Sequence, residues 1–302
     1  MKTAFLFPGQ GAQSVGMGRA LAETLPVVKK LFTRAGDILG YDLLELCANG
    51  PAERLDATEY SQPALYVCSL AAVEKFRAEQ PAVVDEVAAV AGLSLGEYTA
   101  LAFAGAMDFE TGLRMVQERG RAMQAAADAR EGGMVSVLGL DRDKVESLID
   151  EARGEDVLQI ANLLCPGNIV VSGGRDACAR LTESATKAGA MKVIPLAVAG
   201  AFHTPLMAAA YERLSAAVVN AKIVAPRIPV ISNVDAKPHD DPAEIRQLLV
   251  RQLVSPVLWE DSMRRLITEH GIERCFEVGP GRVLTGLLKR IDRKFPCENV
   301  AA

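Results

Sequence analysis

The chain has 302 residues, of which 50% are hydrophobic, and its formal net charge is −5 with no long basic run, so it can bury a large core and is not expected to bind nucleic acid. No stretch is long and apolar enough to predict a membrane span, and the apolar run at the N-terminus is too short for a signal peptide, so we expect a cytoplasmic protein with no membrane partner. The 6 cysteines are scattered without a Cys-x-x-Cys pair, which favours free, buried thiols over disulfides or a metal site.

A glycine-rich loop follows the first predicted strand. The apolar residues 3–7 predict the strand, and the loop runs from Pro8 to Gly18. Ser14 stands where a dinucleotide-binding fingerprint needs glycine, and no Gly-Lys-Ser/Thr sequence follows, so the loop does not favour nucleotide binding. Its backbone N–H groups can instead approach a reacting atom closely, which suits an oxyanion hole.

Two helical segments come next. Residues 21–39 form one amphipathic pattern, which predicts a single helix. Residues 62–79 place their apolar side chains on one helical face and predict a second. Pro81 ends this helix, and we expect the chain to lead from there directly into the next strand.

The sequence Gly92-Leu93-Ser94-Leu95-Gly96 lies between a predicted buried strand, residues 87–91, and a predicted helix, residues 95–104. A Gly-x-Ser-x-Gly turn in this context is typical of a nucleophile elbow, in which the glycines leave room for a tight turn and the serine is exposed at the end of the sheet. The helix N-terminus behind the serine favours developing negative charge. A glycine-rich turn whose serine only caps the helix would have the same sequence. We take Ser94 as the candidate nucleophile.

Arg119 is a charged residue among small and apolar neighbours. Asp108 is the predicted N-cap of a helix that covers residues 109–127, and on this helix Arg119 is in line with Met115, Ala122 and Ala126. A guanidinium in such surroundings is poorly solvated unless an anion lies beside it. The sequence leaves two possibilities open. One is a snorkelling arginine or a structural ion pair with Glu118 or Glu97, and the other is a bidentate clamp for a carboxylate substrate.

The middle of the chain predicts a separate small unit. Between residues 130 and 198, predicted strands and helices follow one another in the order βαββαβ, which is typical of a ferredoxin-like fold. We therefore predict an α/β fold with two parts. The first is a hydrolase-like core with a parallel sheet, built from residues 1–129 and 199–302, and the second is an inserted ferredoxin-like α+β subdomain at residues 130–198.

Only 3 histidines are available to act as a base. His270 follows a predicted helix, where its charge suits the helix dipole, and His239 lies in a polar turn expected at the surface. His203 follows an apolar strand and a glycine-bearing bend, so it is the best candidate base if Ser94 is a nucleophile. A buried, hydrogen-bonded histidine without a catalytic role is the alternative. No acidic residue stands out as the third member of a Ser-His-acid triad, which is unlike a hydrolase.

Short motifs spread along the chain together resemble one family. In chain order they are Phe7-Pro8-Gly9-Gln10-Gly11-Ala12-Gln13, Ser61-Gln62-Pro63-Ala64, Gly92-Leu93-Ser94-Leu95-Gly96-Glu97, Gln117-Glu118-Arg119-Gly120, Gly133-Met134, Ala161-Asn162 with Pro166-Gly167, Phe202-His203, Ser232-Asn233-Val234, Gln252 with Pro256-Val257, and Glu277-Val278-Gly279-Pro280-Gly281. Their order on a chain of this length resembles the malonyl-CoA:acyl-carrier-protein transacylase family of bacterial type II fatty acid synthesis. The resemblance covers nearly the whole chain.

The resemblance implies a role for each matching residue. Ser94 is expected to take the acyl group as an ester, His203 to act first as general base and then as acid, and Arg119 to bind the malonyl carboxylate. The backbone N–H groups of Gln10 and Leu95 are expected to form the oxyanion hole. In this family a main-chain carbonyl orients the histidine, which explains the missing acid. The remaining implied residues are Gln252, whose carbonyl would orient the histidine, and Gln62, Asn162 and Phe202, which would contact the substrate, the ring of Phe202 crowding an α-methyl branch.

The implied activity is a ping-pong transfer of the malonyl group from malonyl-CoA to the phosphopantetheine thiol of acyl carrier protein, which supplies fatty acid synthesis. The family implies a monomer, and no metal or bound cofactor is expected besides the coenzyme A and phosphopantetheine thioesters that are the substrates. An esterase or thioesterase with the same Ser-His pair, an acyltransferase of a polyketide pathway and a non-catalytic carrier-docking protein are the alternatives. Leu93 departs from the family, which usually has histidine before the nucleophile. We expect the chemistry to survive with altered packing beside the elbow.

Overall fold

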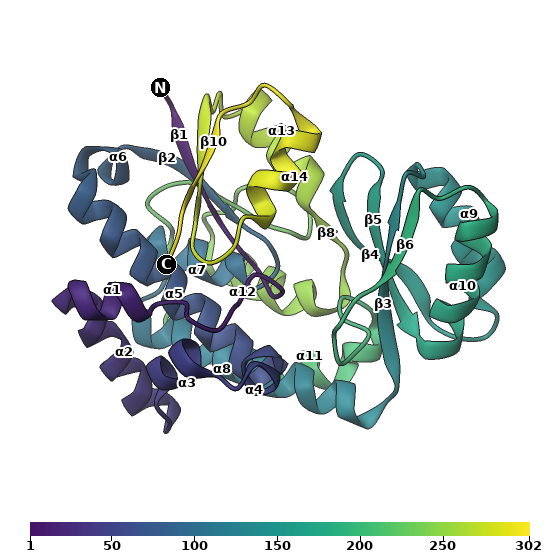
Figure 1. Cartoon of the computed structure of the whole chain (residues 1–302), viewed down its shortest axis with the longest axis horizontal. Coiled ribbons are helices and arrows are strands. Elements are labelled where there is room, and N and C mark those ends of the chain that lie inside the picture. The colour runs from purple at the N-terminus through teal and green to yellow at the C-terminus, as the bar shows by residue number, and fades with distance from the viewer.

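Two five-stranded sheets organise the chain, which is described over residues 1–302 by a computed structural model (Figure 1). The first sheet is entirely parallel, in the order β10-β9-β1-β2-β7. Because parallel strands place their carboxyl ends at one edge, the loops that follow them meet there. The strands of this sheet are β1 (Thr3–Phe7), β2 (Val87–Gly92), β7 (Val230–Ile231), β9 (Arg274–Val278) and β10 (Cys297–Val300).

Apolar side chains cover both faces of this sheet, and the sequence of β1 shows why. Phe5 and Phe7 join the larger apolar cluster on one face, whereas Ala4 and Leu6 join a second cluster on the other face. The helices that contribute to the larger cluster include α2 (Pro26–Leu39), α5 (Thr58–Glu79), α7 (Gly96–Phe103), α8 (Phe109–Ala129), α11 (Ala208–Val219) and α12 (Pro242–Arg251). The second cluster is formed with α13 (Trp259–Thr268) and α14 (Val283–Ile291).

Short helices complete the core. They are α1 (Arg19–Thr24), α3 (Leu43–Asn49), α4 (Ala52–Asp56) and α6 (Pro81–Asp85), together with the 3₁₀ turns η1 (Pro205–Met207) and η2 (Gln252–Val254). None of the helices combines the length and the apolar character that a membrane span needs.

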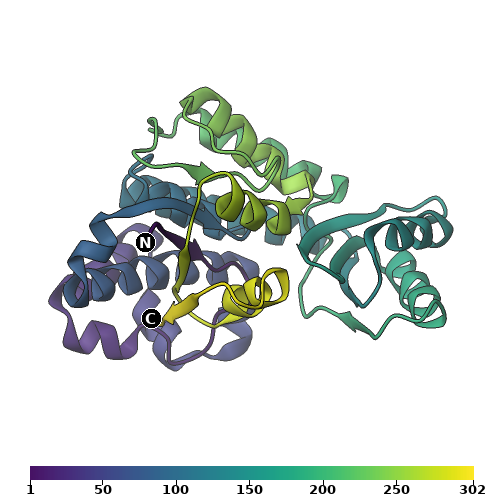
Figure 2. The same cartoon turned by 90° about the horizontal axis from the view of Figure 1, so that it is seen from above.

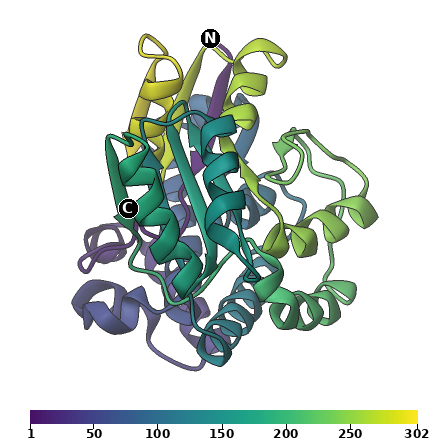
Figure 3. The ribbon, with the colours of Figure 1, turned by 90° about the vertical axis from the view of Figure 1, so that its right-hand side faces the viewer.

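The second sheet belongs mainly to the middle of the chain and stands to one side of the core (Figure 2). Its order is β6-β3-β5-β4-β8, and the first four strands pair antiparallel. Numbered along the chain these four strands lie in the order 4-1-3-2 with two helices on one face, which is the ferredoxin-like arrangement (Figure 3). The elements are β3 (Gly132–Leu138), α9 (Arg142–Arg153), β4 (Leu158–Cys165), β5 (Asn168–Gly174), α10 (Arg175–Lys187) and β6 (Lys192–Pro195). The predicted fold class is therefore confirmed.

The fifth strand of this sheet comes from elsewhere in the chain. β8 (Val257–Leu258) pairs parallel with β4, joining Val257 to Asn162 and Leu258 to Leu163. The small sheet is thus tied by backbone hydrogen bonds to a segment that follows α12 in the core.

Two local predictions are wrong, and proline is the reason in both. The pattern over residues 21–39 is interrupted, because α1 ends at Thr24 and α2 begins at Pro26. A proline lacks the N–H that an interior helical position must donate but fits the first position of a helix. For the same reason Pro81 does not lead directly into a strand but begins the short helix α6.

The ferredoxin-like unit has a core of its own, which predicts where it is vulnerable. Leu181 on α10 is fully buried in a cluster formed by that unit alone. We expect Leu181→Ala to lower the free energy of unfolding by about 2–5 kcal/mol, because it removes buried methyl groups and leaves a cavity. Urea denaturation measures the loss. Glu183→Ala, an exposed change on the same helix, is the control and should stay within about 0.5 kcal/mol of the parent; equal stability of the two variants would contradict the packing.

Candidate active site

The turn between β2 and α7 holds Ser94 in a strained conformation. Ser94 has a φ of 49°, in the left-handed region that a residue with a side chain rarely adopts. A Cβ on Gly92 would overlap the backbone of Gly96, and a Cβ on Gly96 would overlap that of Phe7. The strand, turn and helix expected of a nucleophile elbow are therefore all present, and glycine is required at both flanking positions.

Asn233, directly after β7, holds this turn in place, and sequence reasoning did not assign it a role. Its side-chain oxygen accepts a hydrogen bond from the backbone N–H of Ser94 (2.6 Å), and its side-chain nitrogen donates to the carbonyl of Gly92 (2.8 Å). Asn233 is fully buried. The signal that could have identified it is topological, because β2 and β7 are parallel neighbours whose carboxyl ends lie at the same edge.

His203 lies against Ser94 and is oriented by a main-chain carbonyl. Its Nε2 is 2.9 Å from Ser94 Oγ, and its Nδ1 is 2.8 Å from the carbonyl oxygen of Gln252. Since a carbonyl only accepts, Nδ1 carries the proton and Nε2 is free to accept the proton of the serine hydroxyl. No carboxylate contacts the ring. His203 also has a positive φ of 62°, and Gln159 on β4, which sequence reasoning missed, donates to its carbonyl (2.9 Å).

The environment keeps the imidazole of His203 neutral. Burial lowers its pKa to about 4, and the nearby positive charge of Arg119 adds to the effect, against the opposing hydrogen bond to Gln252. A neutral imidazole is the form that can act as a base.

Arg119 is a buried cation with no carboxylate beside it. Its side chain is 1% exposed, so it does not snorkel, and Glu118 pairs instead with Arg213 on the surface. The guanidinium donates to the side-chain oxygens of Gln62 (2.8 Å) and Gln252 (3.0 Å) and to Ser94 Oγ (3.0 Å).

One aromatic contact and one unpaired atom complete the description of this guanidinium. It lies 5.4 Å from the ring centroid of Tyr98, and its Nε has no partner. Burial lowers the pKa of Arg119 from its usual value. Of the two possibilities left open by the sequence, the structural ion pair is absent, and a cation with an unused donor lies ready for an anion.

A cavity of about 180 Å³ opens in front of these groups, between the parallel-sheet core and the ferredoxin-like unit. Most of its lining is apolar, and such a lining disfavours water beside Ser94 and His203. Seven of the residues predicted for the site line it: Gln10, Ser94, Leu95, Arg119, Asn162, Phe202 and His203. The other two, Gln62 and Gln252, do not line it but lie behind Arg119 and hold it.

Two backbone donors in the cavity are free. Neither the N–H of Gln10 nor that of Leu95 donates to another group of the protein. Both residues line the cavity beside Ser94, so the two N–H groups are available to an oxygen that develops negative charge.

Leu93 forms part of the apolar wall and leaves the elbow intact. Its backbone N–H donates to the carbonyl of Phe7 (3.0 Å), and its own carbonyl accepts from Gly96 (2.9 Å). Its half-buried side chain packs on the same cluster as Leu164 and Leu287. These contacts are apolar. The wall of the cavity is therefore apolar at this position, whereas the histidine that is usual in the family would place a hydrogen-bonding ring there.

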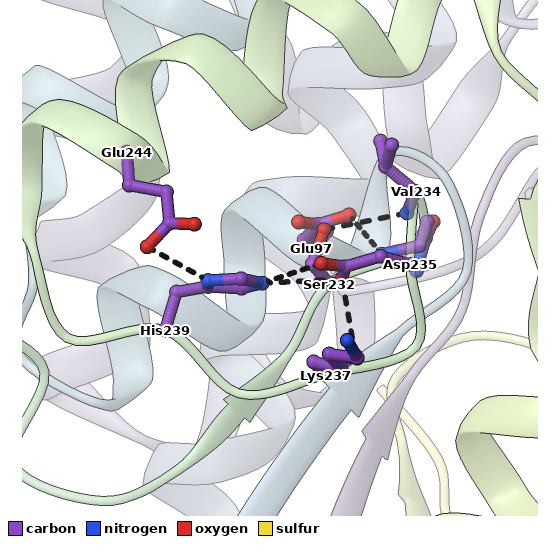
Figure 4. A network of polar contacts seen from close by, with 8 residues as sticks. Glu97, Ser232, Val234, Asp235, Lys237, His239 and Glu244 are labelled. Atoms are coloured by element: carbon purple, nitrogen blue, oxygen red, sulfur yellow. Dashed lines mark hydrogen bonds and ion pairs between the residues drawn. The ribbon is translucent and has the colours of Figure 1, made fainter.

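His239 is more enclosed than its polar turn predicts. Its side chain is 11% exposed and lies between the carboxylates of Asp235 (2.9 Å) and Glu244 (3.0 Å), as Figure 4 shows. Burial alone would lower the pKa of His239, but the two carboxylates outweigh it and the pKa is raised. The turn lies on the surface as predicted, with Lys237, Pro238, Asp240 and Asp241 exposed, and only the ring of His239 is partly covered, by Glu244 of α12.

The pKa of His203 is lowered and that of His239 is raised, so the two histidines should titrate at different pH values. In protein labelled with ¹³C in its 3 histidines, the NMR signal that disappears in His203→Asn belongs to His203. We expect this signal to titrate with a midpoint at about pH 4, so the imidazole should be almost entirely neutral at about pH 5.5. The signal lost in His239→Asn should titrate above the ordinary histidine value. A midpoint of about 6 or higher for His203 would contradict the burial and charge described for it.

Comparison with known proteins places the chain in a family. Residues 4–297 match the acyl transferase domain family. The chain is 42% identical over 295 residues to the malonyl CoA-acyl carrier protein transacylase of Bacillus subtilis (strain 168), covering 97% of this chain and 92% of that protein.

Solved structures agree. The malonyl CoA-acyl carrier protein transacylase from Coxiella burnetii has a TM-score of 0.95 at 38% identity, with 99% of this chain and 94% of that chain covered. A malonyl-transacylase solved in complex with its type II PKS acyl-carrier protein has a TM-score of 0.93 at 38% identity, with 100% of this chain and 96% of that chain covered. The chain therefore belongs to the acyl transferase family, as its motifs predicted.

Proposed function

We propose that this protein transfers the malonyl group of malonyl-CoA to the phosphopantetheine thiol of an acyl carrier protein, through a malonyl ester of Ser94. The observation that carries the proposal is the buried guanidinium of Arg119, which touches Ser94 Oγ and has no carboxylate in contact with it. An acyl group that ends in a carboxylate would supply the missing anion when its other end lies at the serine. The names of the relatives favour the same substrate pair.

In the first half-reaction, Ser94 attacks the thioester carbonyl. His203 Nε2 takes the hydroxyl proton as the bond from Ser94 Oγ to the carbonyl carbon forms. The free N–H groups of Gln10 and Leu95 stabilise the oxyanion. The carbon–sulfur bond then breaks, and His203 returns the proton to the sulfur of coenzyme A, which leaves as a thiol.

In the second half-reaction, the carrier thiol attacks the malonyl ester. His203 takes the thiol proton, the thioester forms, and the proton passes to Ser94 as the ester bond breaks. Water must not reach the ester before the carrier does, and the apolar lining supports this exclusion. Every group in these steps comes from one chain, so the proposed reaction is compatible with a monomer.

Selectivity for the acyl group follows from the residues that line the cavity or hold its lining residues. Arg119, held by Gln62 and Gln252, distinguishes a malonyl from an acetyl group, because only the former has a carboxylate to pair with the guanidinium. The ring of Phe202, which is 4% exposed and lines the cavity, leaves little room for an α-methyl branch. Asn162, on the wall contributed by β4, is a further substrate-binding residue in the proposal.

The intact mass of the protein tests the proposal most directly. Brief mixing with malonyl-CoA should give a malonyl adduct on the parent and none on Ser94→Ala, and added carrier protein should discharge the adduct. An adduct that decays as fast in water as with carrier would identify a thioesterase instead. If the parent neither forms an adduct nor releases coenzyme A, the protein is not a catalyst of this reaction, and the remaining alternative is a non-catalytic protein that docks to the carrier. The adduct is then mixed separately with a carrier protein of fatty acid synthesis and with one of polyketide synthesis. The carrier that discharges it faster indicates which pathway the enzyme serves.

The clamp is tested by Arg119→Ala. We expect kcat/KM for malonyl-CoA to fall by about 30-fold to several-thousand-fold, which corresponds to about 2–5 kcal/mol for a buried charge pair that loses one partner. Transfer from acetyl-CoA should be retained or increase. Arg121→Ala, on the exposed side of the same helix, is the control and should leave both reactions unchanged. Unchanged malonyl transfer by Arg119→Ala would exclude the carboxylate role.

A further inference from the structure

A buried carboxyl group lies behind the site, and the proposed reaction does not use it. Glu97, in the first turn of α7, is 3% exposed and has no lysine, arginine or histidine within ion-pair distance. Its Oε2 accepts hydrogen bonds from the backbone N–H of Asn233 (3.0 Å) and from Nε2 of Gln252 (2.7 Å). A carboxylate this deeply buried is costly unless its charge has a counterpart.

The side chain of Gln252 connects this carboxylate to Arg119. The amide oxygen of Gln252 accepts from the guanidinium (3.0 Å), and the amide nitrogen of the same side chain donates to Glu97. The amide therefore has its negative end toward the cation and its positive end toward the carboxylate, and its nitrogen also donates to the carbonyl of Ser94 (3.0 Å). One amide group separates the two charges.

No other cation faces Glu97. The ionisable groups near it are Arg119 on α8 and the phenol of Tyr98 on α7. From the segment after β7, Glu97 meets the neutral residues Ser232 and Asn233, and the pair of His239 and Asp235 lies farther along that segment (Figure 4). From η2 it meets the neutral Gln252.

We propose that Glu97 is the resting counter-charge of Arg119, a positioning residue that acts through Gln252 and takes up a proton when the carboxylate of a substrate reaches the guanidinium. This inference rests on the proposed function and deepens it. The substrate carboxylate brings a second negative charge to one buried cation, and the low-dielectric interior does not tolerate two carboxylates there. Glu97 can become neutral by binding a proton and keep both of its hydrogen bonds, whereas the substrate must stay ionised to bind the guanidinium.

The ordinary chemistry of the two groups supports this exchange. Burial raises the pKa of Glu97 to about 7, although its hydrogen bonds and Arg119 lower it in part. A substrate carboxylate bound to Arg119 neutralises the positive charge that lowers the pKa of Glu97, so the pKa of Glu97 rises further. His203 responds in the same direction but starts from a pKa of about 4, so it stays neutral above pH 7 and does not compete for the proton.

Proton uptake on binding is the direct test. Ser94→Ala holds malonyl-CoA without turnover, and calorimetry in buffers of different ionisation enthalpy counts the protons bound at about pH 7.5. We expect uptake of a measurable fraction of a proton with malonyl-CoA and none with acetyl-CoA, which has no carboxylate. Adding Glu97→Gln should abolish the uptake, because glutamine keeps an acceptor for Asn233 and Gln252 but cannot titrate. Adding Glu118→Gln, a partly exposed residue beside Arg119, should leave it intact.

Steady-state kinetics give a second readout that a merely structural role would not change. In the parent, KM for malonyl-CoA should rise above about pH 7, approaching tenfold per pH unit, and in Glu97→Gln this rise should be absent. The KM for acetyl-CoA should show no such rise in either protein. If Glu97→Gln does not fold, the pH dependence of KM on the parent is still a test. A rise with malonyl-CoA and none with acetyl-CoA supports the inference, and equal behaviour of the two substrates contradicts it.

Absence of uptake with malonyl-CoA, or uptake that persists in Glu97→Gln, overturns the inference. The mass experiment separates this failure from a failure of the proposed function. A malonyl adduct on Ser94 without proton uptake refutes only the role of Glu97, whereas the absence of an adduct refutes the transferase.

Discussion

The site depends on one buried charge, the guanidinium of Arg119. Taking a cation out of water is expensive, and this protein offsets the cost with neutral oxygens and an aromatic face, since no carboxylate contacts it. The same charge helps to keep His203 neutral and lies against Ser94 Oγ. The anion that would satisfy the guanidinium fully is therefore one that enters the cavity. In the proposed reaction that anion is the carboxylate of the acyl group.

The parallel sheet brings these groups together. The loop after β1 supplies Gln10, the turn after β2 supplies Ser94, and the segment after β7 supplies Asn233, all at one edge of the sheet. The strain at Ser94 persists because the side chain of Asn233 bonds the backbone on both sides of the turn. The oxyanion donors of the proposed mechanism are main-chain groups of the same edge, so their positions are as rigid as the strands that carry them.

Local sequence predicted much of this arrangement. The strand–glycine–serine–glycine–helix order identifies the turn at Ser94 without any distant information, and a count of 3 histidines left His203 as the candidate base. The ferredoxin-like order of strands was also readable, because each of its elements has its own periodicity. Two local predictions failed at prolines: the apolar pattern continued across Pro26, which starts a new helix, and the short helix α6 stands between Pro81 and the strand that was expected to follow it directly.

The rest depends on contacts between distant parts of the chain. The sequence showed that Arg119 stands among apolar neighbours but not whether an acid from elsewhere pairs with it. Asn233 lies 139 residues from Ser94, and Gln159 lies 44 residues from His203. An amide that bonds a backbone carbonyl has no local sequence pattern, because only the fold determines which carbonyl it meets.

The short strand β8 has a consequence for the small unit as a module. Residues 130–198 have the strand order of an independent fold, yet β4 is an edge strand only within that segment, because β8 from the core pairs with Asn162 and Leu163. Excised alone, the segment would present the backbone of β4 to solvent as an open edge, ready to pair with another copy. Asn162 also lines the cavity. Exchanging this unit between related enzymes would therefore have to include the β8 segment, or the transplanted cavity wall would lose the backbone pairing that positions it.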